Sequence, residues 1–346
     1  MTRRETILSR VLGPIAVAVT GVLVIGLAPT AFADDSQIIA ERTADLIADV
    51  APDVGDVVEP EQVGSQLIAE GDNVEVAIPI NGDLPITIEA TLEEGVVIPL
   101  QVTLPEEISV RDAKVADDGT IVFASDERHS AHAAVQVLED GSVRMETVMV
   151  SPQGPSEFTY DFGDAIPVIQ DDGSVDLVLA FDAEEFILEV IVGEIESPWA
   201  MDANGESVET YYVVNDEGQL VQIVEPAPGT KYPIVADPKV SASINGWSID
   251  FNRAETKVAA SSKAALIQKI TDAGLTISGV ILAWMNLSTA SFVAGIASLY
   301  ALYGGYTLQV ASTAYAKGQC LRMNMGLFPL AGFVPVPIAY SGGNCK

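Results

Sequence analysis

The runs DDGSVDLVLAF (residues 171–181) and EEFILEVIV (residues 184–192) decide the fold class. Both are short, apolar and rich in β-branched residues, and the Asp172-Gly173 dipeptide tolerates the positive φ values of a tight hairpin. Comparable runs, such as NVEVAIPI, PITIEATL and SVRMETVMV, recur from Asn73 to Asp237. Turn dipeptides lie between many of them, at Asn81-Gly82, Asp118-Gly119, Asp140-Gly141, Asn204-Gly205 and Glu217-Gly218. The pattern predicts a mainly β domain of about ten antiparallel strands, a sandwich or an open barrel.

The first 33 residues have the order of a secretory signal. Three arginines in MTRRETILSR precede an apolar run from Val11 to Ala28, and the small residues Ala31-Phe32-Ala33 come just before Asp34. This order is typical of a signal peptide that is cleaved after export. We therefore expect cleavage near Ala33 and a mature protein that is extracellular or associated with the cell envelope.

An amphipathic helix and a linker are predicted over residues 34–72. Apolar residues recur at helical spacing in SQIIAERTADLIADV, residues 36–50. Pro52, Gly55, Pro60 and Gly64 then interrupt the pattern. The acidic β domain is expected over residues 73–238.

Charge is unevenly distributed along the 346 residues, whose formal net charge is −32. Residues 34–239 contain 7 basic and 45 acidic residues, whereas residues 240–346 contain 7 basic and 3 acidic ones. This change places a domain boundary near Pro238. A surface this acidic repels nucleic acid, which excludes nucleic-acid binding. The acidity is consistent with simple solvation of an extracellular domain, and also with a surface for cations or a basic partner.

The C-terminal region, residues 239–346, is predicted to be a small α-helical domain closed by a disulfide. Helical patterns cover residues 261–272, 275–303 and 306–317. Cys320 and Cys345 are the only cysteines, and a lone pair in an exported protein predicts one disulfide.

A charge-free stretch runs between Asp272 and Lys317. A helix over residues 275–303 would be about 43 Å long, enough to cross a bilayer with tilt. Three interpretations remain open: the core of a helical domain, a bacteriocin-like element that inserts into a membrane, and a permanent anchor. A single crossing would place the two cysteines in a reducing cytosol, which argues against the anchor. If residues 275–305 contact a membrane, the expected contacting side chains are Trp284, Phe292, Tyr300 and Tyr303.

Few residues suggest chemistry. His129 and His132 are weak metal candidates, since positions three apart point to opposite faces of a strand. Paired acids such as Asp171-Asp172 read as solvated turns, in which weak Ca²⁺ binding is conceivable. The sequence contains no nucleophile-elbow, zinc-protease or phosphate-loop motif. No catalytic residue and no cofactor-binding residue is predicted.

The segments PWAMDANGESVETYY, from Pro198, and YPIVADP, from Tyr232, resemble a module of uncharacterised exported proteins of actinobacterial type. FNRAETKVA, the apolar run, GQC and YSGGNC are similar to the tail that follows this module. The resemblance covers about the last 150 residues and concerns domain order and export. It implies no established activity and no site residues.

The sequence therefore favours an exported, non-enzymatic binding or interaction protein of the cell envelope, whose ligand or protein partner it does not identify. The alternative is an acidic carrier domain for a bacteriocin-like, membrane-inserting C-terminal segment. A third hypothesis is a hydrolase that uses acidic loop residues.

Overall fold

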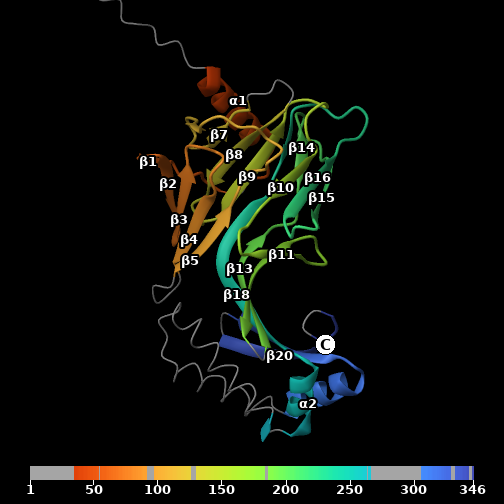
Figure 1. The fold of residues 1–346 in the computed structure, drawn as a ribbon. Helices are drawn as coiled ribbons and strands as arrows, with labels where there is room; N and C mark the ends of the chain where they lie inside the picture. The colour runs from red at the N-terminus through yellow and green to blue at the C-terminus, as the bar shows by residue number, and fades with distance from the viewer. Residues whose placement is uncertain are drawn as a thin grey trace, which may run out of the picture. The chain divides into compact units, whose positions relative to one another are not determined.

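The computed structural model describes residues 35–53, 55–91, 97–125, 130–183, 186–262, 264–265, 305–328, 332–342 and 345–346. Residues 35–346 belong to one unit (Figure 1). The predicted signal peptide lies outside the described residues. The labelled helices are α1 (Asp35–Val50) and α2 (Arg253–Ser261), and residues 305–316 form a further helix.

The strands follow one another as β1 (Glu61–Val63), β2 (Gln66–Gly71), β3 (Val74–Pro79), β4 (Ile86–Thr91), β5 (Val97–Val102), β6 (Lys114–Val115), β7 (Ile121–Phe123), β8 (Ala131–Val137), β9 (Val143–Met149) and β10 (Glu157–Tyr160). The later ones are β11 (Ile166–Ile169), β12 (Val175–Ala183), β13 (Phe186–Ile195), β14 (Ala200–Asp202), β15 (Glu209–Val214), β16 (Leu220–Glu225), β17 (Ile234–Ala236), β18 (Lys239–Phe251), β19 (Cys320–Phe328) and β20 (Gly332–Tyr340). The fold is thus mainly antiparallel β, as predicted. It has more strands than expected, because strands of two to four residues such as β6 and β11 carry too short a pattern to be recognised.

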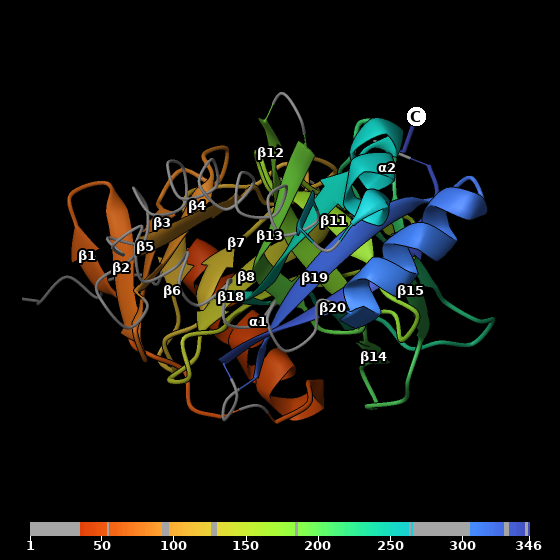
Figure 2. The ribbon, with the colours of Figure 1, turned by 90° about the horizontal axis from the view of Figure 1, so that it is seen from below.

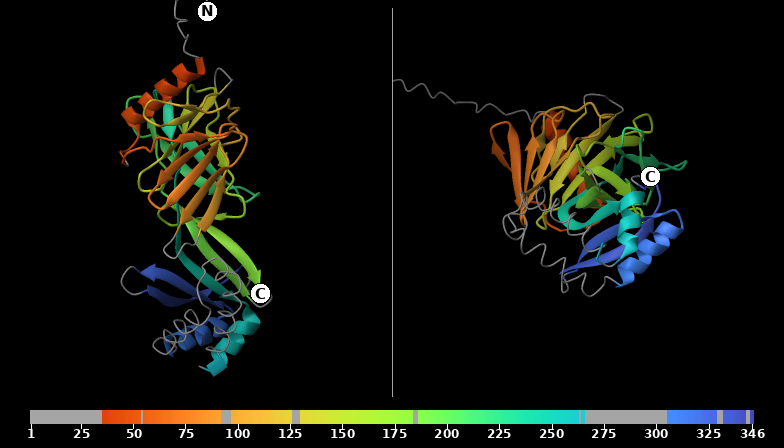
Figure 3. Two further views of the ribbon diagram at one scale, coloured as in Figure 1. Left: turned by 90° about the vertical axis from the view of Figure 1, so that its left-hand side faces the viewer. Right: turned by 60° about the horizontal axis from the view of Figure 1, so that its bottom comes forward.

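The strands form three sheets. One has five strands in the order β1-β2-β3-β4-β5, and one has three in the order β10-β16-β15. The twelve-stranded large sheet runs β11-β12-β13-β18-β9-β8-β7-β6, with β14 and β17 joined to β9, and β19 and β20 joined to β18. Successive strands of the five-stranded sheet pair with one another, as expected for a chain of hairpins (Figure 3).

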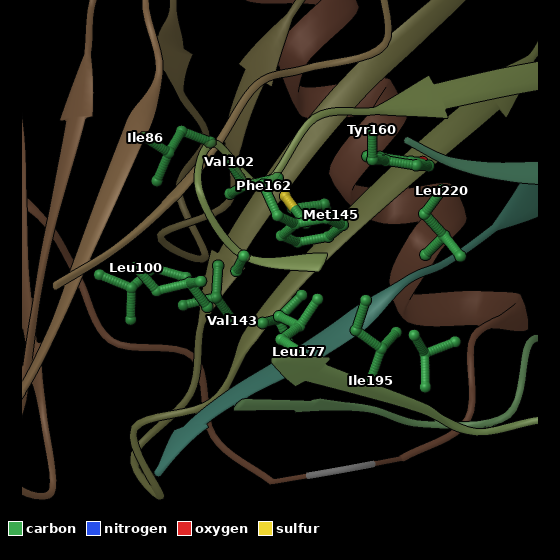
Figure 4. Packing of buried hydrophobic residues seen from close by; sticks show 14 of the residues in the cluster. Ile86, Leu100, Val102, Val143, Met145, Tyr160, Phe162, Leu177, Ile195 and Leu220 are labelled. Atoms are coloured by element: carbon green, nitrogen blue, oxygen red, sulfur yellow. The ribbon is translucent and has the colours of Figure 1, made fainter. Parts of the chain in front are cut away.

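The main core lies between the five-stranded sheet, the three-stranded sheet and one face of the large sheet. Ile86 and Leu100 of the first, Leu220 of the second and Met145 of the third are all buried in one apolar cluster (Figure 4). Period-two alternation explains this arrangement, because it places every second residue of a strand on the same face. Strand β9 is an exception, since all seven of its residues are buried.

Helix α1 covers the other face of the large sheet at β6, β7 and β8. Its buried side chains include Ala40 and Ile47, which form a second apolar cluster with Val148 of β9 and Val235 of β17. The predicted helix over residues 36–50 is confirmed. Strand β9 is therefore covered on both faces, which explains its complete burial.

The C-terminal region differs from the prediction of a helical domain. Its described part is mostly β-strand: β18 pairs with β13 and β19, and β19 pairs with β20. Helix α2 and helix 305–316 pack beside this extension of the large sheet (Figure 2). The Pro- and Gly-rich sequence from Cys320 to Lys346 is compatible with a pinned loop or a short hairpin, and the structure shows the hairpin. The predicted disulfide between Cys320 and Cys345 is present.

Five of the six predicted turn glycines adopt φ between 73° and 90°, at Gly119, Gly141, Gly173, Gly205 and Gly218. Gly82 has a different role: a Cβ there would lie 2.5 Å from Val110 Cγ2 and 2.9 Å from Phe123 Cδ1. Glycine is required at residue 82 because any larger side chain would collide with these two neighbours, and not because the backbone adopts an unusual conformation.

Candidate functional site

The two quoted segments PWAMDANGESVETYY and YPIVADP are paired with each other in the fold. Strand β14 runs antiparallel to β17, with Ala200 opposite Ala236 and Asp202 opposite Ile234. The Asp202 carboxylate accepts hydrogen bonds from the backbone N–H groups of Asn204, Glu206 and Lys231, at 2.8–3.1 Å. These bonds lower the pKa of Asp202. The first segment is therefore a hairpin closed by an aspartate that organises its turn.

At the other end of this pairing, Asp237 lies beside Trp199. The Asp237 Oδ1 atom accepts a 2.9 Å bond from the Trp199 N–H and a 3.1 Å bond from Gln222 Nε2. Gln222 belongs to β16, so this carboxylate joins the large sheet to the three-stranded sheet. Asp237 is fully buried.

A second buried carboxylate, Glu146, stands opposite Asp237 on β9. Residues Ile234–Ala236 pair with Met149–Thr147, and Lys239 pairs with Arg144 in the same register. Continuing this register through the junction places Asp237 opposite Glu146, so that both side chains point to one face of the sheet. That face is the one that carries Val148 and Val235 toward α1.

Arg144 completes what we call the inner cluster, defined as Arg144, Glu146 and Asp237. Its Nε lies 3.4 Å from Glu146 Oε1, and its Nη2 donates a 2.7 Å bond to the Pro52 carbonyl, just after α1. The guanidinium also lies 5.7 Å from the centre of the Trp199 ring. One cation thus faces two buried carboxylates.

Burial dominates the electrostatics of the inner cluster. It raises the pKa of Glu146 to about 8 despite the opposing attraction of Arg144. Burial likewise raises the pKa of Asp237 to about 8, although the hydrogen bonds from the Trp199 backbone N–H and from the Gln222 side chain act to lower it. The charged form of each acid is disfavoured because water is excluded and the single cation is shared.

Several polar atoms of this layer have no hydrogen-bond partner, including both Glu146 carboxylate oxygens and Asp237 Oδ2. Such atoms are costly to bury, and each one in a folded protein requires an explanation. Glu146 and Asp237 are only 1% and 0% exposed, so no substrate touches them in this conformation. The inner cluster is therefore a buried ionisable group inside the fold rather than an open catalytic site.

Of the two predicted metal candidates, His129 lies outside the described residues. His132 is on β8, and its Nδ1 accepts a 3.0 Å hydrogen bond from the Ser125 N–H. Burial lowers the pKa of His132, so the imidazole is neutral at pH 7. Within the part of the chain that the structure describes, no three His, Cys, Asp or Glu side chains are grouped for a metal ion.

The acidic turns, where weak Ca²⁺ binding was considered, use their carboxylates locally. Asp140 accepts bonds from the N–H and hydroxyl of Ser142, and Asp172 does the same with Ser174. These bonds lower the pKa of Asp172 and contribute to the lowered pKa of Asp140. Each acid therefore stabilises its own hairpin turn.

The two ends of segment 266–304, which contains most of the apolar stretch, are held together. Before it, Arg253 at the start of α2 donates from Nη1 to the carbonyls of Tyr315 and Gln319, at 3.1 and 2.7 Å. Ser312 of helix 305–316 donates to the Ala260 carbonyl at 3.4 Å. Strands β18 and β19 pair directly beneath these helices.

The predicted membrane-contacting residues Trp284, Phe292, Tyr300 and Tyr303 lie outside the described residues, as does the predicted helix 275–303. Among the helices that the structure does describe, none is both long and apolar enough to span a bilayer.

Comparison with known proteins gives no relative: no protein-family model matches the chain, and a search of the curated proteins also finds no match.

Sequence reasoning missed the inner cluster, although a signal was present. Arg144 and Glu146 lie two residues apart in SVRMETVMV, so they share one face of a strand whose other face is apolar. By pattern alone, the charged face of such a strand is expected to meet water. The packing of α1 on that face and the contact with the three-stranded sheet bury the two charges.

Proposed function

We propose that the protein is an exported, non-enzymatic interaction protein of the cell envelope that offers segment 266–304 to a membrane. The observation that supports this proposal is the joining of the two ends of the segment through Arg253 and Ser312. A segment whose residues 273–304 carry no charge, and whose flanks are held by one scaffold, is suited to enter and leave a bilayer from the same side.

A single crossing fits this arrangement poorly. If the segment crossed once, β18 and β19 would lie on opposite sides of the membrane, and their register from Gly246–Gly326 to Asp250–Arg322 would have to be broken. A loop avoids this cost and keeps the Cys320–Cys345 disulfide in an oxidising compartment. The same pairing disfavours a carrier that releases a free toxin-like tail.

The described residues near the segment supply a favourable charge. Lys257 on α2 and Lys317 after helix 305–316 are exposed, whereas Glu255, the acid of α2, is buried in a capping box with Asn252. Lysines beside an apolar segment attract anionic lipid. The resemblance to exported proteins of actinobacterial type is part of this proposal. In the fold, its two motifs contain the paired strands β14 and β17.

The test is flotation of the mature chain, residues 34–346, with vesicles of phosphatidylglycerol and phosphatidylcholine and with vesicles of phosphatidylcholine alone. We expect binding, stronger to the anionic vesicles, and its loss in the double variant Trp284→Asp/Phe292→Asp. The matched control is Ile166→Asp/Val168→Asp, which adds the same charges at exposed apolar positions of β11. Absence of flotation by the folded wild-type chain, or equal loss in both variants, would reject the proposal.

A further inference from the structure

We propose that Glu146 and Asp237 share a proton and form a pH-sensitive latch, which holds α1 and the following turn on the large sheet at neutral pH and loosens them at alkaline pH. The latch concerns only described residues and is independent of membrane contact.

The first argument is the balance of charge. Extending the register of β17 and β18 on β9 places residue 237 opposite residue 146, and the charge of Asp237 acts on Glu146. Arg144 lies beside Glu146. Two ionised carboxylates with one cation would leave a net negative charge in a layer that is almost closed to water. Burying an uncompensated charge is far more costly than binding a proton. One proton held between the acids removes the imbalance and gives an unpaired carboxylate oxygen a partner.

The second argument is that, among the residues that the structure describes, Arg144 is the cation that acts on both acids. The facing groups are neutral: Gln136 of β8, Trp199 beside β14, Gln222 of β16, Tyr160 of β10 and Tyr212 of β15. Lys239, opposite Arg144, turns away to Glu196 at 2.9 Å and Asp140 at 3.9 Å. The buried side chains of α1 carry no charge: Ile47 is apolar, and Ser36 and Thr43 are neutral hydroxyl residues.

The third argument connects the acids to α1. Arg144 donates to the Pro52 carbonyl, and Trp199 packs in the same apolar cluster as the C-terminal part of α1. Loss of the shared proton adds a second negative charge that competes for the Arg144 guanidinium and draws water into the layer. The bond to Pro52 and the packing of α1 are the contacts that this change weakens.

The sign of the pH dependence follows from the raised pKa values. In the unfolded chain the two acids ionise near 3.8 and 4.5. Burial raises the pKa of both in the folded protein, so the proton that the pair shares is released only near pH 8. Their contribution to stability is therefore complete below about pH 4 and decreases as the pH rises through 8. For one proton, the unfolding equilibrium constant rises up to about tenfold per pH unit in this window. His132 has the opposite sign below pH 6.5, so the clean window is about pH 7 to 8.5.

The experiment measures urea unfolding of the mature chain, and amide hydrogen exchange of α1 corrected for intrinsic rates, from pH 7 to 8.5. We expect the unfolding constant of the wild type to rise by up to about tenfold per unit, and α1 exchange to rise with it. Glu146→Gln should flatten the pH dependence. Glu196→Gln, which changes a carboxylate that is 56% exposed, should leave it unchanged.

An equal slope in Glu146→Gln and the wild type would overturn the proposal, and so would α1 exchange that does not change with pH. If Glu146→Gln does not fold, infrared difference spectroscopy of the wild type answers the question. A protonated buried carboxyl band at pH 7 that disappears by pH 9 supports the shared proton, and its absence at pH 7 excludes it.

Discussion

Arg144 and Arg322 are each surrounded by two carboxylates, and the comparison of these two sites shows how solvent decides the state of an ion cluster. Arg322 forms a bidentate pair with Asp250 and lies 3.3 Å from Glu189; we call these three residues the outer cluster. The outer side chains of Arg322 and Glu189 are 29% and 33% exposed. The inner side chains of Arg144 and Glu146 are 4% and 0% exposed.

The difference lies in what satisfies the second carboxylate. In the outer cluster, Glu189 reaches water, so its charge costs little. In the inner cluster, α1 and the three-stranded sheet exclude water, so the second acid must be neutralised by a proton. The same three residue types therefore make a surface ion network in one place and a protonated acid pair in the other.

The strongest way to break this comparison is Arg144→Met. We expect it to lower the free energy of unfolding by about 3–5 kcal/mol at pH 8.5, because it removes the cation from a buried ion cluster. Urea denaturation followed by circular dichroism measures this loss. A cost below about 1 kcal/mol would mean that Arg144 contributes no more than a surface residue.

The matched change in the outer cluster is Arg322→Met. Its expected cost is about 1–3 kcal/mol, since Asp250 loses a charged hydrogen-bond donor but Glu189 remains hydrated. The same denaturation assay applies. If Arg322→Met cost as much as Arg144→Met, exposure would not be what separates the two clusters.

Salt should produce the smallest difference. In 1 M NaCl the cost of Arg322→Met should decrease by a few tenths of a kcal/mol, because exposed charges are screened, whereas the cost of Arg144→Met should stay constant. The comparison needs only the two variants and the wild type at low and high salt. Equal sensitivity of both variants would show that water and ions reach the inner cluster.

The sequence predicted those features that depend on local pattern. The turn glycines after Asp118, Asp140 and Asp172 follow from backbone conformation, and α1 follows from helical periodicity. The disulfide follows from the two available cysteines. Short strands such as β6 could not be predicted, because two residues are too few to show an alternating pattern. For the β19–β20 region the prolines and glycines left a loop and a short hairpin equally open, and only the pairing of the two strands decides between them.

The inner cluster could not be predicted because its members come from distant parts of the chain. Arg144 and Glu146 read as the solvated face of a strand, and Asp237 reads as the last acid of a closing motif. Their meeting depends on β17 and β18 pairing with β9 in one register, and their burial depends on α1.

The sequence by itself determined the β class, the first helix, the hairpin turns and the disulfide, because each depends on neighbouring residues or on a unique pair. The tertiary structure decided that β18 and β19 join the two sides of the apolar segment, and that one arginine is enclosed with two acids. Those outcomes depend on long-range register and on the exclusion of water, which no local pattern encodes.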